Sequence, residues 1–189
     1  MLYHISLKFW RKIEMFSPRI PKGCLNGVNE NNTIPRICLS DSVENCLTAA
    51  SWGGSNLIND PPYKENELIA IARIYKFDCR KIKRKNLLLP CQIKKYVPDS
   101  LISHEHWVIN QNIFPKKSYV IILRDFFFDI KILEYEGRKY KVYKITRTKY
   151  DILTEEQDNL LISYLNSKNK ESFTRKYINE LYNILNKKS

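Results

Sequence analysis

The stretch IPRICLSDSVENCLTAA, residues 34–50, shows the clearest change of pattern in this 189-residue chain. Its apolar segment RICL, residues 36–39, has the length of a short strand. The polar SDS that follows can cap a helix, and Asp41 with Glu44 resembles a capping box. We therefore expect a strand that leads into a helix over residues 42–51. Its apolar residues recur at helical spacing: Val43, Cys46, Leu47 and Ala50.

Apolar segments on both sides of this stretch predict an α+β fold with a small mixed or antiparallel β core. LYHIS, residues 2–6, predicts a buried first strand, and ELIAIARIY, residues 67–75, has the continuous apolar character of a central strand. A long loop is expected over 7–34 and a shorter one over 53–66. The other expected β segments are strands at 105–110 and 118–125 and a hairpin at 126–146 with its turn at Glu136–Gly137.

The C-terminal part predicts a pair of helices. Thr154 and Gln157 have the spacing of a capping box and open the first of them. A second helix is indicated by apolar residues at helical spacing: Phe173, Tyr177, Leu181 and Ile184. We expect a basic α+β domain over 1–149 and a helical element over 150–189.

The charge of the chain is strongly positive, with 32 Lys and Arg against 20 Asp and Glu. Such a chain favours RNA, DNA or a nucleoprotein as its partner. Residues 150–189 hold six basic and six acidic residues, so the excess of +12 lies within 1–149. The alternative is a Lys- and Asn-rich composition caused by an AT-rich genome, which would spread the charge more evenly.

A basic stretch at residues 73–95 contains nine basic residues, one acid and interleaved aromatic residues. Phosphate contacts and base stacking require these residue types, whereas a solvated charged loop is the alternative. The candidate nucleic-acid-binding residues are Arg73, Arg80, Lys81, Lys83, Arg84, Lys85, Lys94 and Lys95.

Three histidines are candidates for chemistry. His4 lies within the first predicted strand, where a histidine is either a catalyst or a hydrogen-bonded core residue. In SHEHW, His104 and His106 would share one face of a strand while Glu105 points to the other. The two imidazoles could bind a metal, but a third ligand is not evident, so we expect no metal. As an acid–base pair, His and Glu would need to share a cleft with a substrate.

Two arginines follow prolines, Arg19 in SPRIP and Arg36 in IPRICLS. Proline stiffens the backbone and so presents the guanidinium from a fixed position, a geometry that suits phosphate or carboxylate. A surface arginine at the edge of a loop is the alternative.

The cysteine content does not favour a disulfide scaffold or a zinc ribbon. The chain has five cysteines and no CxxC pair, which fits reduced thiols in the cytosol. The N-terminal segment lacks the apolar core of a signal peptide, and no run approaches the roughly 18 apolar residues of a membrane helix.

The order LYHIS, a long loop, IPRICLS, SVENCLTAA and a later strand with Glu105 resembles the ADP-ribosyltransferase-like fold over about residues 1–125. The fold also includes RNA 2′-phosphotransferases. The resemblance implies NAD as cofactor, with a first-strand histidine on a ribose and a late acid at the nicotinamide ribose. The sequence departs from one branch of the family in lacking a clear tyrosine after the second strand, and Glu105 is a single acid. His4, Ser40 and Glu105 are the matching positions. The candidate cofactor-binding residues are His4, Ser6, Arg19 and Ser40, and the candidate catalytic residues are His4, Arg36 and Glu105.

The motifs also resemble those of small phage and mobile-element proteins, which implies a role against host defence in the host cytosol. Three functions follow. The first is an ADP-ribosyltransferase-like enzyme acting on a nucleic acid or nucleoprotein. The second is an NAD-independent RNA-cleaving protein on the same scaffold, and the third is a non-catalytic inhibitor that binds RNA, DNA or a nucleoprotein.

Overall fold

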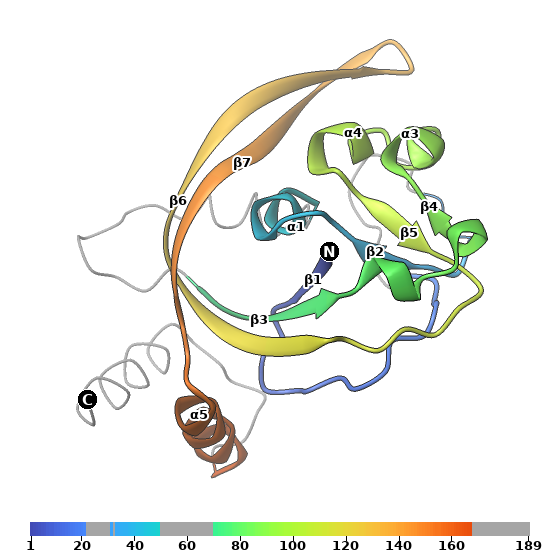
Figure 1. The fold of residues 1–189 in the computed structure, drawn as a ribbon. Coiled ribbons are helices and arrows are strands. Elements are labelled where there is room, and N and C mark those ends of the chain that lie inside the picture. Colours follow the sequence, from blue (N-terminus) through green and yellow to red (C-terminus); the bar gives the residue numbers. More distant parts are fainter. Residues whose placement is uncertain (22–30, 32, 50–69, 168–189) are drawn as a thin grey trace.

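The computed structural model describes residues 1–21, 31, 33–49 and 70–167 (Figure 1). Its strands form two sheets in which all pairs are antiparallel. The larger sheet has the order β1-β3-β6-β7 and the smaller has the order β2-β5-β4. The α+β prediction is confirmed. The strands are β1 (Leu2–Ser6), β2 (Ile37–Leu39), β3 (Ala70–Phe77), β4 (Leu87–Leu88), β5 (His106–Val108), β6 (Lys117–Tyr135) and β7 (Arg138–Ile152).

Four α-helices and two short 3₁₀ turns complete the described elements. The α-helices are α1 (Val43–Ala49), α3 (Pro90–Ile93), α4 (Ser100–Ser103) and α5 (Glu155–Ser167), and the turns are η1 (Cys79–Lys81) and η2 (Arg84–Asn86). The expected helix at 42–51 is thus present as α1. Its cap is Ser42, one of the polar residues expected to cap it, whose hydroxyl accepts the Asn45 backbone N–H at 3.1 Å. The expected Asp41–Glu44 box is wrong, since the Asp41 carboxylate contacts His104 instead.

The two sheets meet where β1 runs beside the end of β2. Tyr3 and Ser40 exchange two backbone hydrogen bonds, of 2.7 and 2.9 Å. Between the sheets lies an apolar core that includes Leu2, Leu39 and Tyr75. Because side chains alternate along a strand, His4 points to the same side of β1 as Leu2 and so reaches the edge of this core.

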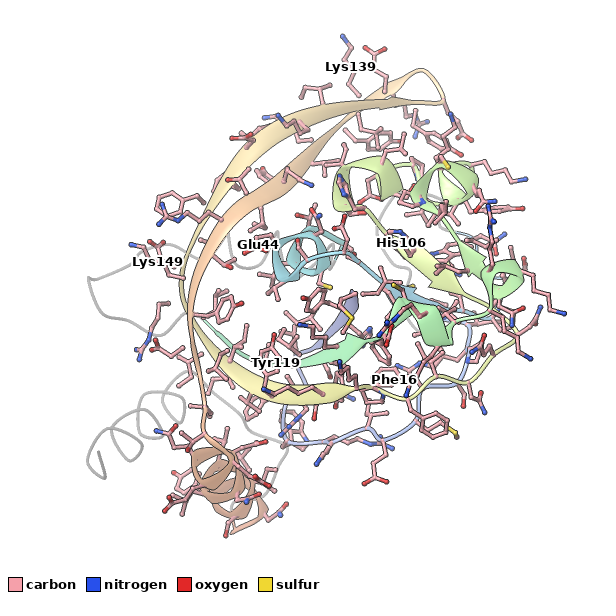
Figure 2. All side chains as sticks on the ribbon, viewed as in Figure 1. Phe16, Glu44, His106, Tyr119, Lys139 and Lys149 are labelled. Atoms are coloured by element: carbon pink, nitrogen blue, oxygen red, sulfur yellow. The ribbon has the colours of Figure 1, made fainter. Side chains whose placement is uncertain are left out.

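Strands β6 and β7 form one long ribbon that extends past the larger sheet and curls around α1 and α4 (Figure 1). The hairpin expected at 126–146 is the outer part of this ribbon, and its turn contains Glu136 and Gly137, both with positive φ. The pairing register shifts at Leu123/Asp125 and at Phe127/Phe128. Such bulges bend a strand and increase its twist, which accounts for the curvature. Figure 2 shows Lys139 near the free end of the ribbon.

Helix α5 packs on the larger sheet. Its capping box is confirmed, because the Thr154 N–H donates to Gln157 Oε1 and the Gln157 N–H donates to Thr154 Oγ1. Leu161 and Leu165 are buried in a cluster with core residues of β3 and β6. Strand β7 continues to Ile152 and so crosses the expected boundary between the basic domain, 1–149, and the helical element, 150–189. The expected second C-terminal helix and the loop at 53–66 lie outside the described residues.

Candidate functional site

His4 is held at the junction of the two sheets by a single backbone contact. Its Nδ1 lies 3.0 Å from the carbonyl oxygen of Cys38. A carbonyl can only accept, so Nδ1 carries the hydrogen and Nε2 of the neutral ring is left as an acceptor. Burial lowers the pKa of His4; the bond to Cys38 opposes this shift, and the charge of Arg19 adds to it. The ring also contacts Phe16 edge-on, with centroids 5.1 Å apart.

Arg36 and Glu105 both contact Trp107. Arg36 is only 2% exposed, and its Nη1 donates to the backbone carbonyls of Asn31 and Ile34. The guanidinium carbon lies 4.1 Å from the centroid of the Trp107 ring. Glu105 is 7% exposed, and its carboxylate accepts the indole N–H at 2.8 Å. Burial and the nearby Glu105 raise the pKa of the adjacent Cys38 thiol.

The three expected catalytic residues surround β2 but lie on its two faces. Cys38 pairs with Trp107 and Leu39 with His106, so alternation places Glu105 and Trp107 on the Cys38 face. His4 follows Tyr3, the partner of Ser40, and therefore lies beside Leu39 on the opposite face. The structure thus brings Arg36 and Glu105 together around Trp107. It places His4 beside Leu39, on the face of the strands that also carries His106, the partner of Leu39 in β5.

The other expected cofactor-binding residues are close to this junction. Arg19 is exposed and forms an isolated antiparallel bridge with Arg36, with backbone bonds of 3.1 and 2.9 Å. Ser40 is 1% exposed and bonds to the Cys46 thiol, although burial still raises the pKa of Cys46 to about 12. Ser6, at the end of β1, is partly buried and lies opposite Arg73.

The histidines of SHEHW differ from the expectation. His104 has a left-handed backbone, with φ of 50°, because it ends helix α4 and does not lie on a strand. Only His106 belongs to β5. His104 instead contacts Asp41 with its side chain and His106 with its carbonyl.

Seven of the expected nucleic-acid-binding residues are exposed on the segment from η1 to the residues just after α3. The backbone of this segment is held by Gln111, whose side chain accepts the Lys83 N–H and donates to the Lys81 carbonyl, each at 2.9 Å. Arg80 is 84% exposed and pairs with Asp78, which keeps the pKa of that carboxyl well below its usual range. The seven residues are Arg80, Lys81, Lys83, Arg84, Lys85, Lys94 and Lys95; we call them the basic segment.

Arg73 differs from this group, and the expectation that it meets nucleic acid is wrong. It is 1% exposed in the centre of β3, where its side chain is enclosed. Its Nε donates to the Phe9 carbonyl, and its two terminal nitrogens contact both carboxylate oxygens of Asp158 at 2.9 and 2.6 Å. Arg73 therefore fixes α5 to the sheet.

Among the described residues, no three His, Cys, Asp or Glu side chains are grouped so that they could hold a metal ion. No described helix is long and apolar enough to cross a membrane. Comparison of the chain with protein-family models, curated proteins and solved structures gives no match.

Proposed function

We propose that this protein is an ADP-ribosyltransferase-like enzyme that binds NAD beside His4 and acts on a nucleic acid or nucleoprotein. The observation that supports this most is the fixed tautomer of His4, whose Nδ1–H is bonded to Cys38 and whose Nε2 can accept a hydrogen bond. A ribose hydroxyl is a suitable donor for that nitrogen. Burial favours the neutral ring that this contact requires, because it lowers the pKa of His4.

Arg19 supports a phosphate-bearing ligand at the same place. Its guanidinium is close enough for its charge to lower the pKa of His4, and its side chain is exposed. A planar guanidinium binds phosphate through two parallel hydrogen bonds. A dinucleotide with a ribose on His4 and its pyrophosphate on Arg19 would use both groups.

The acceptor side of the proposal is supported by the basic segment. Its seven cations are exposed, and one of them, Arg80, forms an ion pair with Asp78. Cations of this kind bind phosphate by releasing counterions, independently of sequence. A role against host defence, in which the modified target belongs to the host, is part of the same proposal.

NAD binding is tested by thermal unfolding with and without the dinucleotide. NAD at a hundred times its dissociation constant would stabilise the native state by about 2.7 kcal/mol. For a chain of this size that is a rise in melting temperature of roughly 5–11 °C. His4→Ala should abolish the rise, while Lys139→Ala on the exposed end of the ribbon should retain it. No rise in the unaltered protein at millimolar NAD would refute the proposal.

A non-catalytic nucleic-acid binder is the second candidate, and the exposed basic segment favours it equally. Full biological function in a His4→Ala, Glu105→Ala variant would favour the binder over the transferase. RNA cleavage by His4 and Glu105 is less well supported, because it needs both side chains in one cleft and Glu105 is buried against Trp107 on the other face of β2. The transferase proposal rests on His4 and Arg19 and not on Glu105.

A further inference from the structure

A second group of titratable side chains lies at the start of β5, on residues that the proposed NAD site does not use. Asp41 Oδ2 lies 2.8 Å from Nδ1 of His104, and Nδ1 of His106 lies 2.8 Å from the carbonyl oxygen of His104. Both Nδ1 atoms are therefore engaged. The two Nε2 atoms are left for a ligand, and both rings have their orientation fixed by hydrogen bonds.

Two further residues complete the group from other elements. Asn45 on α1 donates to Asp41 Oδ1 at 2.6 Å and accepts from the Lys144 ammonium at 2.5 Å. The Lys144 ammonium also donates to the Ile102 carbonyl. An ammonium has three hydrogens, so Lys144 retains one for a ligand. We call Asp41, Asn45, His104, His106 and Lys144 the imidazole cluster.

The imidazole cluster is accessible, and its two histidines differ in environment. The His104 and Asp41 side chains are 49% and 44% exposed, and their contact becomes an ion pair when His104 is protonated. His106 is partly buried, and burial lowers its pKa, although its bond to His104 and the charge of Asp41 oppose that shift. One ring thus has a carboxylate partner for its charged form, while the other is biased to the neutral form. Unequal environments of this kind assign acid and base roles in enzymes.

The backbone at His104 sets the position of its side chain. Its φ of 50° is the left-handed conformation that commonly ends a helix, and histidine is among the residues enriched in that conformation. Here the conformation turns the chain from α4 into β5 and brings the imidazole to Asp41.

The basic segment adjoins the imidazole cluster through α3 and α4. The Ser100 hydroxyl donates to the Pro90 carbonyl at 3.1 Å, which ties the start of α4 to the start of α3. Lys94 and Lys95 follow α3 directly, and His104 ends α4. To reach the two histidines, a polyanion bound along the basic segment would extend from α3 across α4.

We propose that the imidazole cluster is a catalytic site that cleaves RNA by transesterification, an activity separate from NAD-dependent transfer. Nε2 of neutral His106 removes the proton from a ribose 2′-hydroxyl, and that oxygen forms a bond to the adjacent phosphorus. The bond from phosphorus to the 5′-oxygen breaks, and protonated His104 supplies a proton from Nε2 to that oxygen. The products are a 2′,3′-cyclic phosphate and a free 5′-hydroxyl.

The remaining residues of the cluster support this step. The Lys144 ammonium stabilises the negative charge that develops on the non-bridging phosphate oxygens. Asp41 and Asn45 are positioning residues, because Asp41 orients His104 and Asn45 holds both Asp41 and Lys144. One phosphorus–oxygen bond forms and one breaks, while His106 takes up one proton and His104 releases one. The reaction therefore consumes no co-reactant.

The test uses a DNA oligonucleotide with one internal ribonucleotide, incubated with the full-length protein in EDTA without NAD. Cleavage should occur only at the 3′ side of that ribonucleotide and leave a cyclic phosphate, identified by mass spectrometry. His104→Asn and His106→Asn should each lower the rate by about 10²- to 10⁴-fold. Asparagine is chosen because it tolerates the left-handed backbone at residue 104 and retains an amide donor at residue 106.

Controls separate catalysis from folding and from contaminating nucleases. The all-DNA oligonucleotide should stay intact, and Lys139→Ala should cleave like the unaltered protein. Asp41→Asn should lower kcat with little change in KM and in melting temperature, as expected for a positioning residue. An uncut ribonucleotide substrate would overturn the proposal, and so would cleavage by either asparagine variant at the rate of the unaltered protein. The NAD-dependent shift in melting temperature tests the other activity independently.

Discussion

The ion pair between Arg73 and Asp158 gives the most direct test of how α5 is attached to the larger sheet. Arg73 is 1% exposed and Asp158 19%, and both terminal guanidinium nitrogens contact the carboxylate. Among the described residues, Asp158→Ala would leave the buried guanidinium with the Phe9 carbonyl as its remaining hydrogen-bond partner. Removing one partner of a buried pair costs about 3–5 kcal/mol.

The partial exposure of Asp158 places the expected loss at the lower end of that range, about 3 kcal/mol. This corresponds to a fall in melting temperature of roughly 6–12 °C for a chain of this size. Chemical denaturation followed by circular dichroism measures the change in the free energy of unfolding. The double variant Arg73→Met, Asp158→Leu should recover most of it, apart from about 1 kcal/mol for the unpaired Phe9 carbonyl.

A second Arg–Asp pair provides the matched control. Arg124 and Asp151 are 25% and 60% exposed, so Asp151→Ala should cost less than about 1 kcal/mol. Equal losses for Asp158→Ala and Asp151→Ala would refute the reasoning, because burial would then make no difference. A double variant less stable than Asp158→Ala would refute it as well.

Three further predictions follow from burial and charge. Trp107→Phe should lower the free energy of unfolding by about 1–3 kcal/mol in chemical denaturation, because the buried Glu105 carboxylate loses the indole N–H. In mass-spectrometric mapping at pH 8, iodoacetamide should modify the exposed Cys91 and leave Cys46 unmodified in the native state, since burial raises the pKa of Cys46 to about 12. Replacing Lys83, Arg84 and Lys85 by alanine should weaken the binding of all RNA sequences. The slope of log affinity against log salt concentration should become shallower by up to about 2. An unchanged slope would mean that RNA binds elsewhere.

Local patterns predicted most of the elements. LYHIS forms β1 with the expected bounds. The strand expected at 36–39 is β2, and the helix expected at 42–51 is α1, because apolar runs and helical spacing reflect the faces that each element buries. The length of β6 was not predicted. Its bulges at Leu123/Asp125 and Phe127/Phe128 interrupt the alternation by which a continuous strand is recognised.

The site was predicted less completely, because its contacts join distant parts of the chain. Lys144 reaches Asn45 across 99 residues, and no local signal pairs them. The burial of Arg73 did have a signal, since it lies within the apolar run that was expected to form a central strand. The position of His104 depends on a left-handed residue after a four-residue helix, which periodicity does not reveal.

The central claim is that the protein transfers ADP-ribose to a nucleic acid or nucleoprotein. Its nucleic-acid form is tested by incubating the protein with NAD and a short RNA or DNA and measuring the mass of the oligonucleotide by mass spectrometry. We predict a mass increase equal to one ADP-ribose, lost in His4→Ala and retained in Lys139→Ala. An oligonucleotide without the increase, together with an unchanged melting temperature in NAD, would contradict the account.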